Sequence, residues 1–312
     1  MVFEDHHHPQ FYLFSVATRQ QALLPMIGVY DSGYGGLTVL AAIQRALPQY
    51  SCIFLGDNGR APYGDRDSGI ILDFSEQCVE RLFDEGCRLV IVACHTVSCI
   101  ALRHLQRRYG SAERRILGVT IPAAEMAVQQ LRRSGGTAIG WIGTTRTISS
   151  RTPETEIEKL APDLRIHLFP APLLAAIVEE GLEKSPIAEL AIAHYLKNMP
   201  AVDALVLGCT HYPLLTGVFQ RIVPEGVAVL DPSPYVAGRL VDWLQRHPSF
   251  ATPNPGGKGV LRVLGTGDPK IIRHRGTQFF GAELPEVEHI AEAAGHLAHR
   301  ASPERTRGQV IR

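Results

Sequence analysis

Two cysteines of this chain stand in closely similar local sequences. Cys94 follows a run of aliphatic residues in LVIVACHTVS (89–98), and Cys209 follows another in ALVLGCTHYPL (204–214). Each cysteine is accompanied by one Thr and one His, in opposite orders, and each segment then turns helical. The two thiols are 115 positions apart in sequence, about the length of a small domain. We therefore expect two similar halves, each presenting one thiol at the end of a buried strand.

Two such thiols suit several kinds of chemistry. A cysteine near a helix N-terminus and polar neighbours has its pKa lowered from about 8.5, so we expect available thiolate. Zinc would need three or four ligands; Cys94, His95, Cys209 and His211 could supply them, but no CxxC or HxxxH spacing supports a metal site. A redox pair normally occurs as CxxC, and a Cys–His nucleophile for acyl transfer leaves one thiol without a role. Two bases on opposite faces of one carbon use both thiols and invert a stereocentre. The remaining cysteines, Cys52, Cys78, Cys87 and Cys99, are interpreted as packing residues.

Other polar loops suit an amino-acid ligand. DSGYGG (31–36) offers Asp31 and Ser32 at a predicted strand end, and its free backbone N–H groups can hold a carboxylate. Asp31 could orient an ammonium group, take part in proton transfer near Cys94, or simply cap the turn. Thr144, Thr145 and Thr147, after Gly143, could bind a second carboxylate or cap the next helix.

The elements that must position these residues alternate between strand and helix. Strands are predicted at 27–30, 52–55, 89–93, 116–119, 137–142, 165–169, 204–207, 227–230, 260–264 and 286–289. Helices are predicted at 37–47, from 67, 97–108, 122–133, 153–160, 172–182, 186–198, 213–222, 234–246 and 269–280. This alternation predicts an α/β fold of doubly wound parallel sheets, in which ligands bind at the carboxyl ends of strands. The candidate loops start at Asp31, Asp57, Cys94, Gly143 and Cys209.

Composition narrows the class of protein. The chain has 312 residues, enough for two domains, and its 31 basic and 31 acidic residues make no electrostatic case for nucleic acid. No apolar run reaches the roughly 18 residues of a spanning helix, so no membrane partner is expected. Six sparse cysteines are typical of free thiols in a reducing cytoplasm. Residues 1–25 lack the pattern of a signal peptide and are expected to form a weakly ordered extension.

Several motifs together resemble the glutamate racemase family of the aspartate/glutamate racemase superfamily. They span about residues 26–290: IGVYDSGYGGLTVL, FLGDNGRAPYG, LVIVAC, IGTTRTISS, PLLAAIVEEG, LVLGCTHYPLL and LGTGDP. The resemblance implies a cofactor-independent racemase that interconverts L- and D-glutamate for peptidoglycan precursors. It also implies two α/β domains, about 26–121 plus 231–290 and 122–230, with the active site between them. Residues 291–312 would form a C-terminal tail, and a homodimer is one assembly that the family allows.

The resemblance also implies residue roles. Cys94 would take the proton from D-glutamate and Cys209 the proton from L-glutamate, with assistance from Asp31, Glu179 and His211. Substrate contacts are expected at Ser32, Tyr63, Gly64, His95, Thr96, Thr147 and Thr210.

Two positions depart from the family pattern. His95 stands where the family has Asn, and Ala171 where it commonly has Cys. An imidazole could hydrogen-bond the substrate as a neutral donor, protonate and lower the pKa of Cys94, or crowd glutamate out. His95 therefore motivates an alternative, an enzyme of the same fold acting on aspartate or a hydantoin-like compound. A catalytically weak binding or inhibitor protein is a third hypothesis, against which the presence of both cysteines counts.

Overall fold

The computed structural model describes residues 25–293 and 296–297. The predicted extension 1–25, apart from Pro25, and most of the predicted tail 291–312 lie outside the described residues. Within the tail, the short strands β11 (Glu292–Ala293) and β12 (His296–Leu297) pair antiparallel. None of the helices in the described part of the chain is long and apolar enough to cross a membrane.

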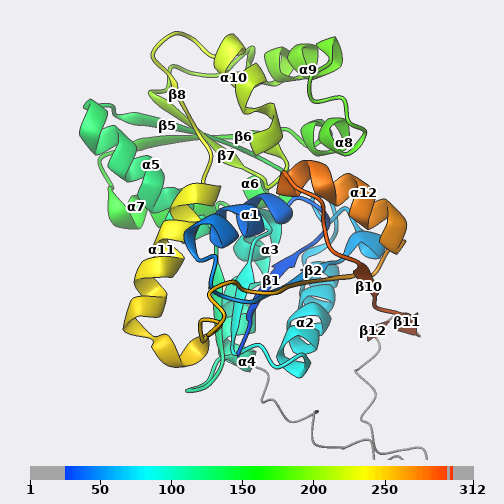
Figure 1. Ribbon diagram of the computed structural model, residues 1–312. Coiled ribbons are helices and arrows are strands. Elements are labelled where there is room, and N and C mark those ends of the chain that lie inside the picture. Colours follow the sequence, from blue (N-terminus) through cyan, green and yellow to red (C-terminus); the bar gives the residue numbers. More distant parts are fainter. Residues whose placement is uncertain (1–24, 294–295, 298–312) are drawn as a thin grey trace, which may run out of the picture.

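Ten further strands form two parallel sheets, seen one above the other in Figure 1. The larger sheet has the order β10 (Val287–His289), β9 (Leu261–Gly265), β2 (Cys52–Gly56), β1 (Ile27–Asp31), β3 (Leu89–Val92) and β4 (Arg115–Gly118). The smaller sheet has the order β6 (Arg165–Pro170), β5 (Ala138–Gly143), β7 (Ala204–Gly208) and β8 (Ala228–Leu230). The predicted α/β class with parallel sheets is confirmed.

The two sheets repeat one strand order. In each, the first strand along the chain lies between the second and the third, and the fourth lies outside the third: β2-β1-β3-β4 and β6-β5-β7-β8. In each, the third strand leads directly to one of the two cysteines, β3 through Ala93 to Cys94 and β7 to Cys209. The similarity that the sequence predicts between the two halves is therefore present in the topology.

Helices cover both faces of each sheet. Their bounds are α1 Leu37–Ala46, α2 Ser68–Asp84, α3 His95–Ile100, α4 Leu102–Tyr109, α5 Thr120–Ser134, α6 Thr145–Ser149, α7 Thr152–Leu160, α8 Leu173–Glu179, α9 Pro186–Leu196, α10 Thr216–Ile222, α11 Ser233–Arg246 and α12 Pro269–Phe280. Short 3₁₀ helices lie at Asn58–Arg60, Tyr212–Leu215 and Pro248–Phe250. Because both faces are covered, β1, β2, β3 and β7 are buried along their whole length, which explains their continuous apolar sequences.

Three apolar clusters form the core. One joins the face of the larger sheet under α1, α11 and α12 to the face of the smaller sheet under α8, α9 and α10. A second lies between the larger sheet and α2, α3 and α4, and a third between the smaller sheet and α5 and α7. Successive residues of β1 alternate between clusters, as side chains of a strand must: Val29 packs in the first and Tyr30 in the second.

One predicted helix is wrong as a single element. The segment 97–108 forms two helices, α3 and α4, which meet at Ala101. The Ser98 hydroxyl donates to the carbonyl of Val92 and accepts from the amide of Val119. These two bonds leave the backbone bonds of α3 in place, from Ser98 to Cys94 and from Ala101 to Val97. The short α3 is thereby tied to the ends of β3 and β4, beside the pocket.

Candidate active site

A pocket of about 210 Å³ lies where the carboxyl ends of the two sheets face each other. Its lining follows the first three strands of each half. From the larger sheet come Ser32 and Gly33 after β1, Ala61 to Asp65 after β2, and Cys94, His95 and Thr96 after β3. From the smaller sheet come Thr144 after β5, Pro172, Ala175, Ala176 and Glu179 after β6, and Cys209, Thr210 and His211 after β7. Both halves thus contribute equivalent loops to one site, as the strand-end rule leads us to expect.

Most of the residues predicted from sequence line this pocket. They are Cys94, Cys209, Glu179, His211, Ser32, Tyr63, Gly64, His95, Thr96 and Thr210. Asp31 and Thr147 do not line it, because both side chains are fully buried behind its wall. Thr147 reaches the pocket only through hydroxyl contacts with Thr96 (3.4 Å) and Thr144 (3.1 Å).

Cys94 lies at the N-cap of α3, at the end of the strand that carries it. The Ser32 hydroxyl is 3.3 Å from its sulfur, within hydrogen-bond distance. Burial raises the pKa of the Cys94 thiol to about 12, with further contributions from the charges of Asp31 and Cys209. The expectation of a lowered pKa is wrong for this thiol, because desolvation outweighs the helix terminus and the Ser32 contact.

Asp31 is a buried carboxyl close to Cys94, and only one of its two oxygens is hydrogen-bonded. Its Oδ2 accepts a hydrogen bond from the amide of Gly33 at 3.0 Å. Its Oδ1 is buried and has no hydrogen-bond partner among the described residues. Burial raises the pKa of the Asp31 carboxyl against the opposing effects of His211 and backbone hydrogen bonds. The carboxyl is therefore held closer to its protonated form than an exposed aspartate, and it can hold a proton near Cys94.

Cys209 has a different set of partners. His211 Nδ1 lies 3.7 Å from the Cys209 sulfur, and His211 Nε2 lies 2.9 Å from Glu179 Oε1. Burial lowers the pKa of His211, but its hydrogen bonds to Cys209 and Glu179 and their charges outweigh burial and raise that pKa to about 10. At neutral pH the ring is therefore an imidazolium next to the second thiol. The two thiols differ in this respect: one borders a carboxyl and a hydroxyl, the other an imidazolium paired with a carboxylate.

His95 is a neutral histidine on the pocket wall. It is 4% exposed, its ring meets Trp141 edge-on with centroids 6.2 Å apart, and its Nδ1 has no hydrogen-bond partner in the described part of the chain. Burial lowers the pKa of His95 to about 4. The hypothesis that a protonated His95 lowers the pKa of Cys94 therefore has no support in this structure. The ring on the pocket wall is therefore neutral, and its Nδ1 is a buried nitrogen without a partner among the described residues.

Threonine hydroxyls join the two halves at the pocket. Thr96, which follows β3, and Thr144, which follows β5, lie 2.9 Å apart through their Oγ1 atoms. The Thr144 hydroxyl also accepts from the amide of Thr147 at the start of α6, so the capping interpretation of Thr144 is confirmed. Thr38 adds a further link across the halves by donating to the carbonyl of Thr210 at 3.1 Å.

Sequence reasoning did not find the residues behind the wall. Asp57, Arg60 and Tyr30 form a buried polar network with Tyr63, although none of the three was predicted as a site residue. The available signal was an acidic and a basic residue three positions apart in the loop that follows a fully buried strand. Among the described residues, no group of three or more His, Cys, Asp or Glu side chains is arranged to hold a metal ion.

Comparison with known proteins gives consistent results. No protein-family model matches the chain. A glutamate racemase of Roseobacter denitrificans is 36% identical over 264 residues, which cover 81% of this chain and 96% of that protein. The solved structure of a glutamate racemase isoform of Bacillus anthracis superposes with a TM-score of 0.79 at 31% identity, covering 87% of this chain and 98% of that one. A glutamate racemase of Francisella tularensis in complex with D-glutamate superposes with a TM-score of 0.77 at 30% identity, covering 85% and 97%.

Proposed function

The chain belongs to the glutamate racemase family, and from this premise we propose that it interconverts L- and D-glutamate through the thiols of Cys94 and Cys209. The observation that carries the proposal is their placement. The two thiols come from equivalent strand ends of two similar halves and line the same pocket. Two acid–base groups on opposite sides of a substrate are what inversion of a stereocentre requires.

In one direction, Cys94 as thiolate removes the α-proton of D-glutamate, and Cys209 delivers a proton to the opposite face. The Ser32 hydroxyl, 3.3 Å from the Cys94 sulfur, can donate to the thiolate. Asp31 is a buried carboxyl whose charge acts on the Cys94 thiol, so we assign it an assisting role in proton transfer at Cys94. Since burial raises the pKa of Cys94 as well, the thiolate that forms is a stronger base towards a weakly acidic carbon.

In the other direction, Cys209 removes the α-proton of L-glutamate and Cys94 protonates the opposite face. His211 is the group that exchanges protons with Cys209, because its Nδ1 lies 3.7 Å from the sulfur. Glu179 holds the opposite ring nitrogen at 2.9 Å and favours the imidazolium. The proton that one thiol loses to the substrate can therefore be replaced from within the site.

The developing carbanion needs stabilisation at the substrate carboxylate. Hydroxyls of Ser32, Thr96, Thr144 and Thr210 surround the pocket, and donors held in a desolvated site stabilise negative charge more strongly than water does. The neutral ring of His95 lines the same pocket. Thiol acid–base chemistry of this kind needs no prosthetic group.

The proposal extends to the cellular role. D-glutamate made in this way would supply peptidoglycan precursors, as the family resemblance implies. We place the protein in the cytoplasm because both reacting thiols must stay reduced, and all six cysteines are free.

The test follows the α-hydrogen of L- and D-glutamate in D₂O by NMR. The wild-type protein is expected to exchange the α-hydrogen of both enantiomers and to invert both. Cys94→Ser and Cys209→Ser are each expected to lose inversion by about 10²–10⁴-fold. Residual exchange without inversion should persist only for the enantiomer that faces the remaining thiol: D-glutamate for Cys209→Ser, L-glutamate for Cys94→Ser.

A matched control is Cys99→Ser, whose sulfur lies outside the pocket and 3.5 Å from the Thr120 hydroxyl. This variant should keep wild-type rates. Absence of exchange for both enantiomers in the wild type would overturn the proposal. Aspartate in the same assay tests the alternative substrate. Faster inversion of aspartate than of glutamate would identify aspartate as the preferred substrate.

A further inference from the structure

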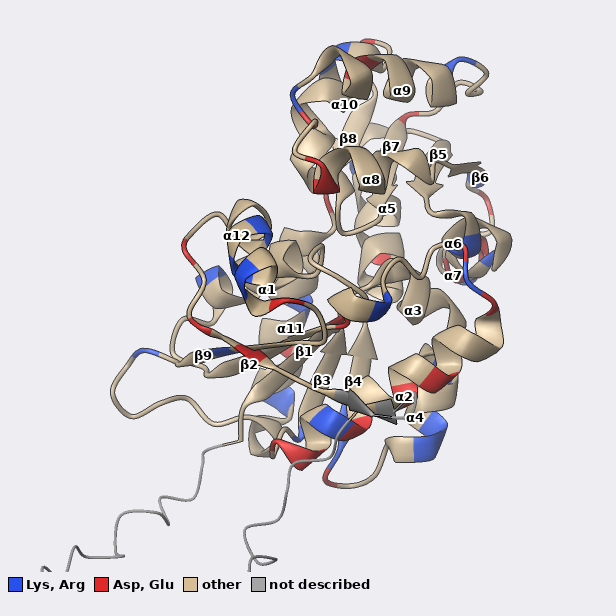
Figure 2. Ribbon diagram, turned by 90° about the vertical axis from the view of Figure 1, so that its right-hand side faces the viewer, with Lys and Arg blue, Asp and Glu red and all other residues tan. Residues whose placement is uncertain are grey.

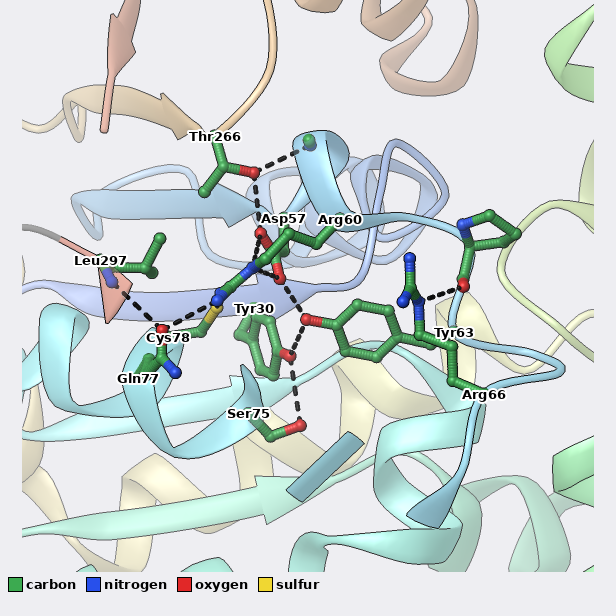
Figure 3. A network of polar contacts seen from close by, with 12 residues as sticks. Tyr30, Asp57, Arg60, Tyr63, Arg66, Ser75, Gln77, Cys78, Thr266 and Leu297 are labelled. Atoms are coloured by element: carbon green, nitrogen blue, oxygen red, sulfur yellow. Dashed lines mark hydrogen bonds and ion pairs between the residues drawn. The ribbon is translucent and has the colours of Figure 1, made fainter. Parts of the chain in front are cut away.

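A buried polar network lies directly behind the loop after β2 that forms one wall of the pocket (Figure 3). Its centre is Asp57, which is fully buried. Arg60 Nε donates to Asp57 Oδ1 at 3.0 Å and to Oδ2 at 2.8 Å. The Thr266 hydroxyl donates to Oδ1 at 2.7 Å, and the Tyr63 hydroxyl donates to Oδ2. The carboxylate therefore fixes the position of a pocket-lining side chain.

The side chain of Arg60 is fixed by hydrogen bonds and by a contact with an aromatic ring. It is 5% exposed, and its Nη1 donates to Gln77 Oε1 at 2.8 Å while its Nη2 lies 3.7 Å from the sulfur of Cys78. Its guanidinium stacks on the ring of Phe74 at 4.1 Å from the centroid. A planar fork of donors in this setting allows one orientation, which a lysine would not reproduce.

Tyr63 connects the buried network to the wall of the pocket. Its ring lies against Phe74 with centroids 5.7 Å apart. Its hydroxyl points towards Asp57 and Tyr30, as Figure 3 shows. Tyr30 in turn donates to the Ser75 hydroxyl at 3.2 Å. The ring of Tyr63 thus serves the pocket wall while its hydroxyl is anchored in the core of the larger sheet.

The other end of the same loop is held by α6, which belongs to the half with the smaller sheet. The amide of Arg146, in α6, donates to the carbonyl of Gly64 at 3.0 Å, and Arg146 Nε donates to the carbonyl of Arg66 at 2.6 Å. A Cβ placed on Gly64 would lie 3.0 Å from Cβ of Thr144. The loop from Ala61 to Arg66 is therefore clamped between the two halves, with little freedom at either end.

Stability alone is a weak reason for this network. Replacing a buried ion pair by apolar residues of similar volume is often neutral or stabilising, because both charges must be desolvated. What such a pair gives in addition is one fixed geometry, as in this case, where the carboxylate bonds a pocket residue directly. The use of the network is best sought in the loop that it orders.

We propose that Arg60, acting through Asp57 and Tyr63, is a positioning residue that holds the Ala61–Gly64 wall in its substrate-binding conformation. This inference rests on the proposed function. Neither reacting thiol belongs to this wall, so we infer that it meets the substrate away from the reacting carbon in both directions of the reaction. Loss of its position should therefore weaken ground-state and transition-state binding equally, and raise KM with little change in kcat.

Three variants test the proposal. Arg60→Lys keeps the charge but loses the fork. Tyr63→Phe keeps the ring on the wall but loses the bond to Asp57. The double variant Asp57→Asn with Arg60→Met leaves no buried charge unpaired, so it guards against a single variant that fails to fold. Arg262→Lys is the matched control, since Arg262 is also an ion-paired arginine, bonded to Glu85 and Glu288, but lines no part of the pocket.

KM and kcat are measured for both enantiomers, and the Kd of D-glutamate is measured by calorimetry in an inert Cys94→Ser, Cys209→Ser background. We expect KM and Kd to rise about 10-fold in Arg60→Lys and in the double variant, equivalent to about 1.4 kcal/mol of binding. Tyr63→Phe should raise both about 3-fold, and kcat should stay within about 3-fold throughout. Arg262→Lys should lower the melting temperature without changing KM.

Lowered melting temperatures with unchanged KM and Kd in all three network variants would overturn the proposal. So would an equal rise of KM in Arg262→Lys. Failure of the proposed function is distinguishable, because the parent protein would then show neither α-proton exchange nor D-glutamate binding.

Discussion

Cys94 and Cys209 are the same chemical group in different surroundings. The first has a neutral hydroxyl and a buried carboxyl nearby, and burial raises its pKa to about 12. The second has an imidazolium at 3.7 Å whose charge is supported by Glu179. L- and D-glutamate are equally stable, so kcat/KM must be equal in the two directions, but kcat itself is free to differ. We expect the direction in which Cys209 donates the proton, starting from D-glutamate, to have its own pH dependence, set by His211.

Glu179→Gln tests this dependence at the residue scale. Hydrogen bonds and charges from Cys209 and Glu179 raise the pKa of His211 to about 10, against burial. Without the carboxylate that pKa falls, so the imidazolium that supplies Cys209 with a proton is lost at lower pH, and the alkaline limb of kcat for D-glutamate should move to lower pH by about one unit. The measurement is kcat against pH between about 6 and 11. Glu180→Gln, which alters the neighbouring residue that faces Arg275 instead, should leave the limb in place. An unmoved limb in Glu179→Gln would contradict the role of His211.

His95 predicts an effect of acid on stability. Burial lowers its pKa from 6.5 to about 4, so the unfolded state binds a proton more readily than the folded state in that range. The destabilising contribution is absent well above pH 6.5, grows as the pH falls through 6.5, and is complete below about 4, where it amounts to about 3 kcal/mol. In His95→Asn the melting temperature should therefore fall less between pH 7 and pH 4 than in the wild type. Parallel curves for the two proteins would show that the ring is accessible to protons.

The same substitution also tests the place of His95 in the pocket. Asn retains a neutral hydrogen-bonding group in a smaller side chain, so His95→Asn is expected to keep or raise racemase activity at pH 7. Complete loss of activity with an intact fold would mean that the imidazole has a catalytic role of its own.

At the scale of elements, the close contact between the loop after β1 and the loop after β7 controls the geometry of the site. A Cβ on Gly35 would lie 2.2 Å from Thr210 Oγ1 and 2.6 Å from His211 Nδ1. Only a residue without a side chain therefore allows the two loops to approach this closely.

Gly35→Ala should displace His211 from Cys209 and lower kcat/KM by about 10²-fold, since displacements near 1 Å have effects of this size. Gly238→Ala is the matched control, because Gly238 lies within α11 and a Cβ there meets nothing within 4 Å. That control should keep full activity and gain up to about 1 kcal/mol of stability. Equal activity of the two alanine variants would show that the loops can separate without consequence.

The positions of the strands, and of the polar residues at their carboxyl ends, can be predicted from the sequence for a physical reason. Parallel strands covered on both faces are continuously apolar, and polar residues at their carboxyl ends meet in space. Cys94 and Cys209 could be recognised in this way. The break between α3 and α4 at Ala101 could not, because no Gly or Pro stands in the segment to signal it. Nor could the raised pKa of Cys94 or the network at Asp57, which depend on neighbours far apart in the chain.

At the scale of the whole molecule, the largest apolar cluster runs from one sheet to the other and includes Val29 and Ile91 as well as Leu205 and Leu207. Basic and acidic residues are interspersed along the ribbon in Figure 2, in keeping with the net charge of zero. The division into domains at 26–121 plus 231–290 and 122–230 stays a prediction. A shared core nevertheless couples the two halves, and so does α11, which contacts both α1 and α5.

This coupling predicts one cooperative unfolding transition. In scanning calorimetry the calorimetric and van't Hoff enthalpies should agree, and D-glutamate should raise the single melting temperature by mass action. Two separable transitions, of which only one responds to D-glutamate, would contradict the shared core.

The repeated strand order has a consequence for the origin of the molecule. Each half brings one thiol, at the end of its third strand, to a boundary with the other half. Two copies of a single ancestral half, related by a twofold axis, would already have enclosed a pocket with a thiol on either side. Gene duplication and fusion would then have freed the copies to diverge, one acquiring Asp31 and Ser32 and the other Glu179 and His211. On this account, a site that inverts its substrate with one thiol on each side would derive from a symmetric dimer of identical halves.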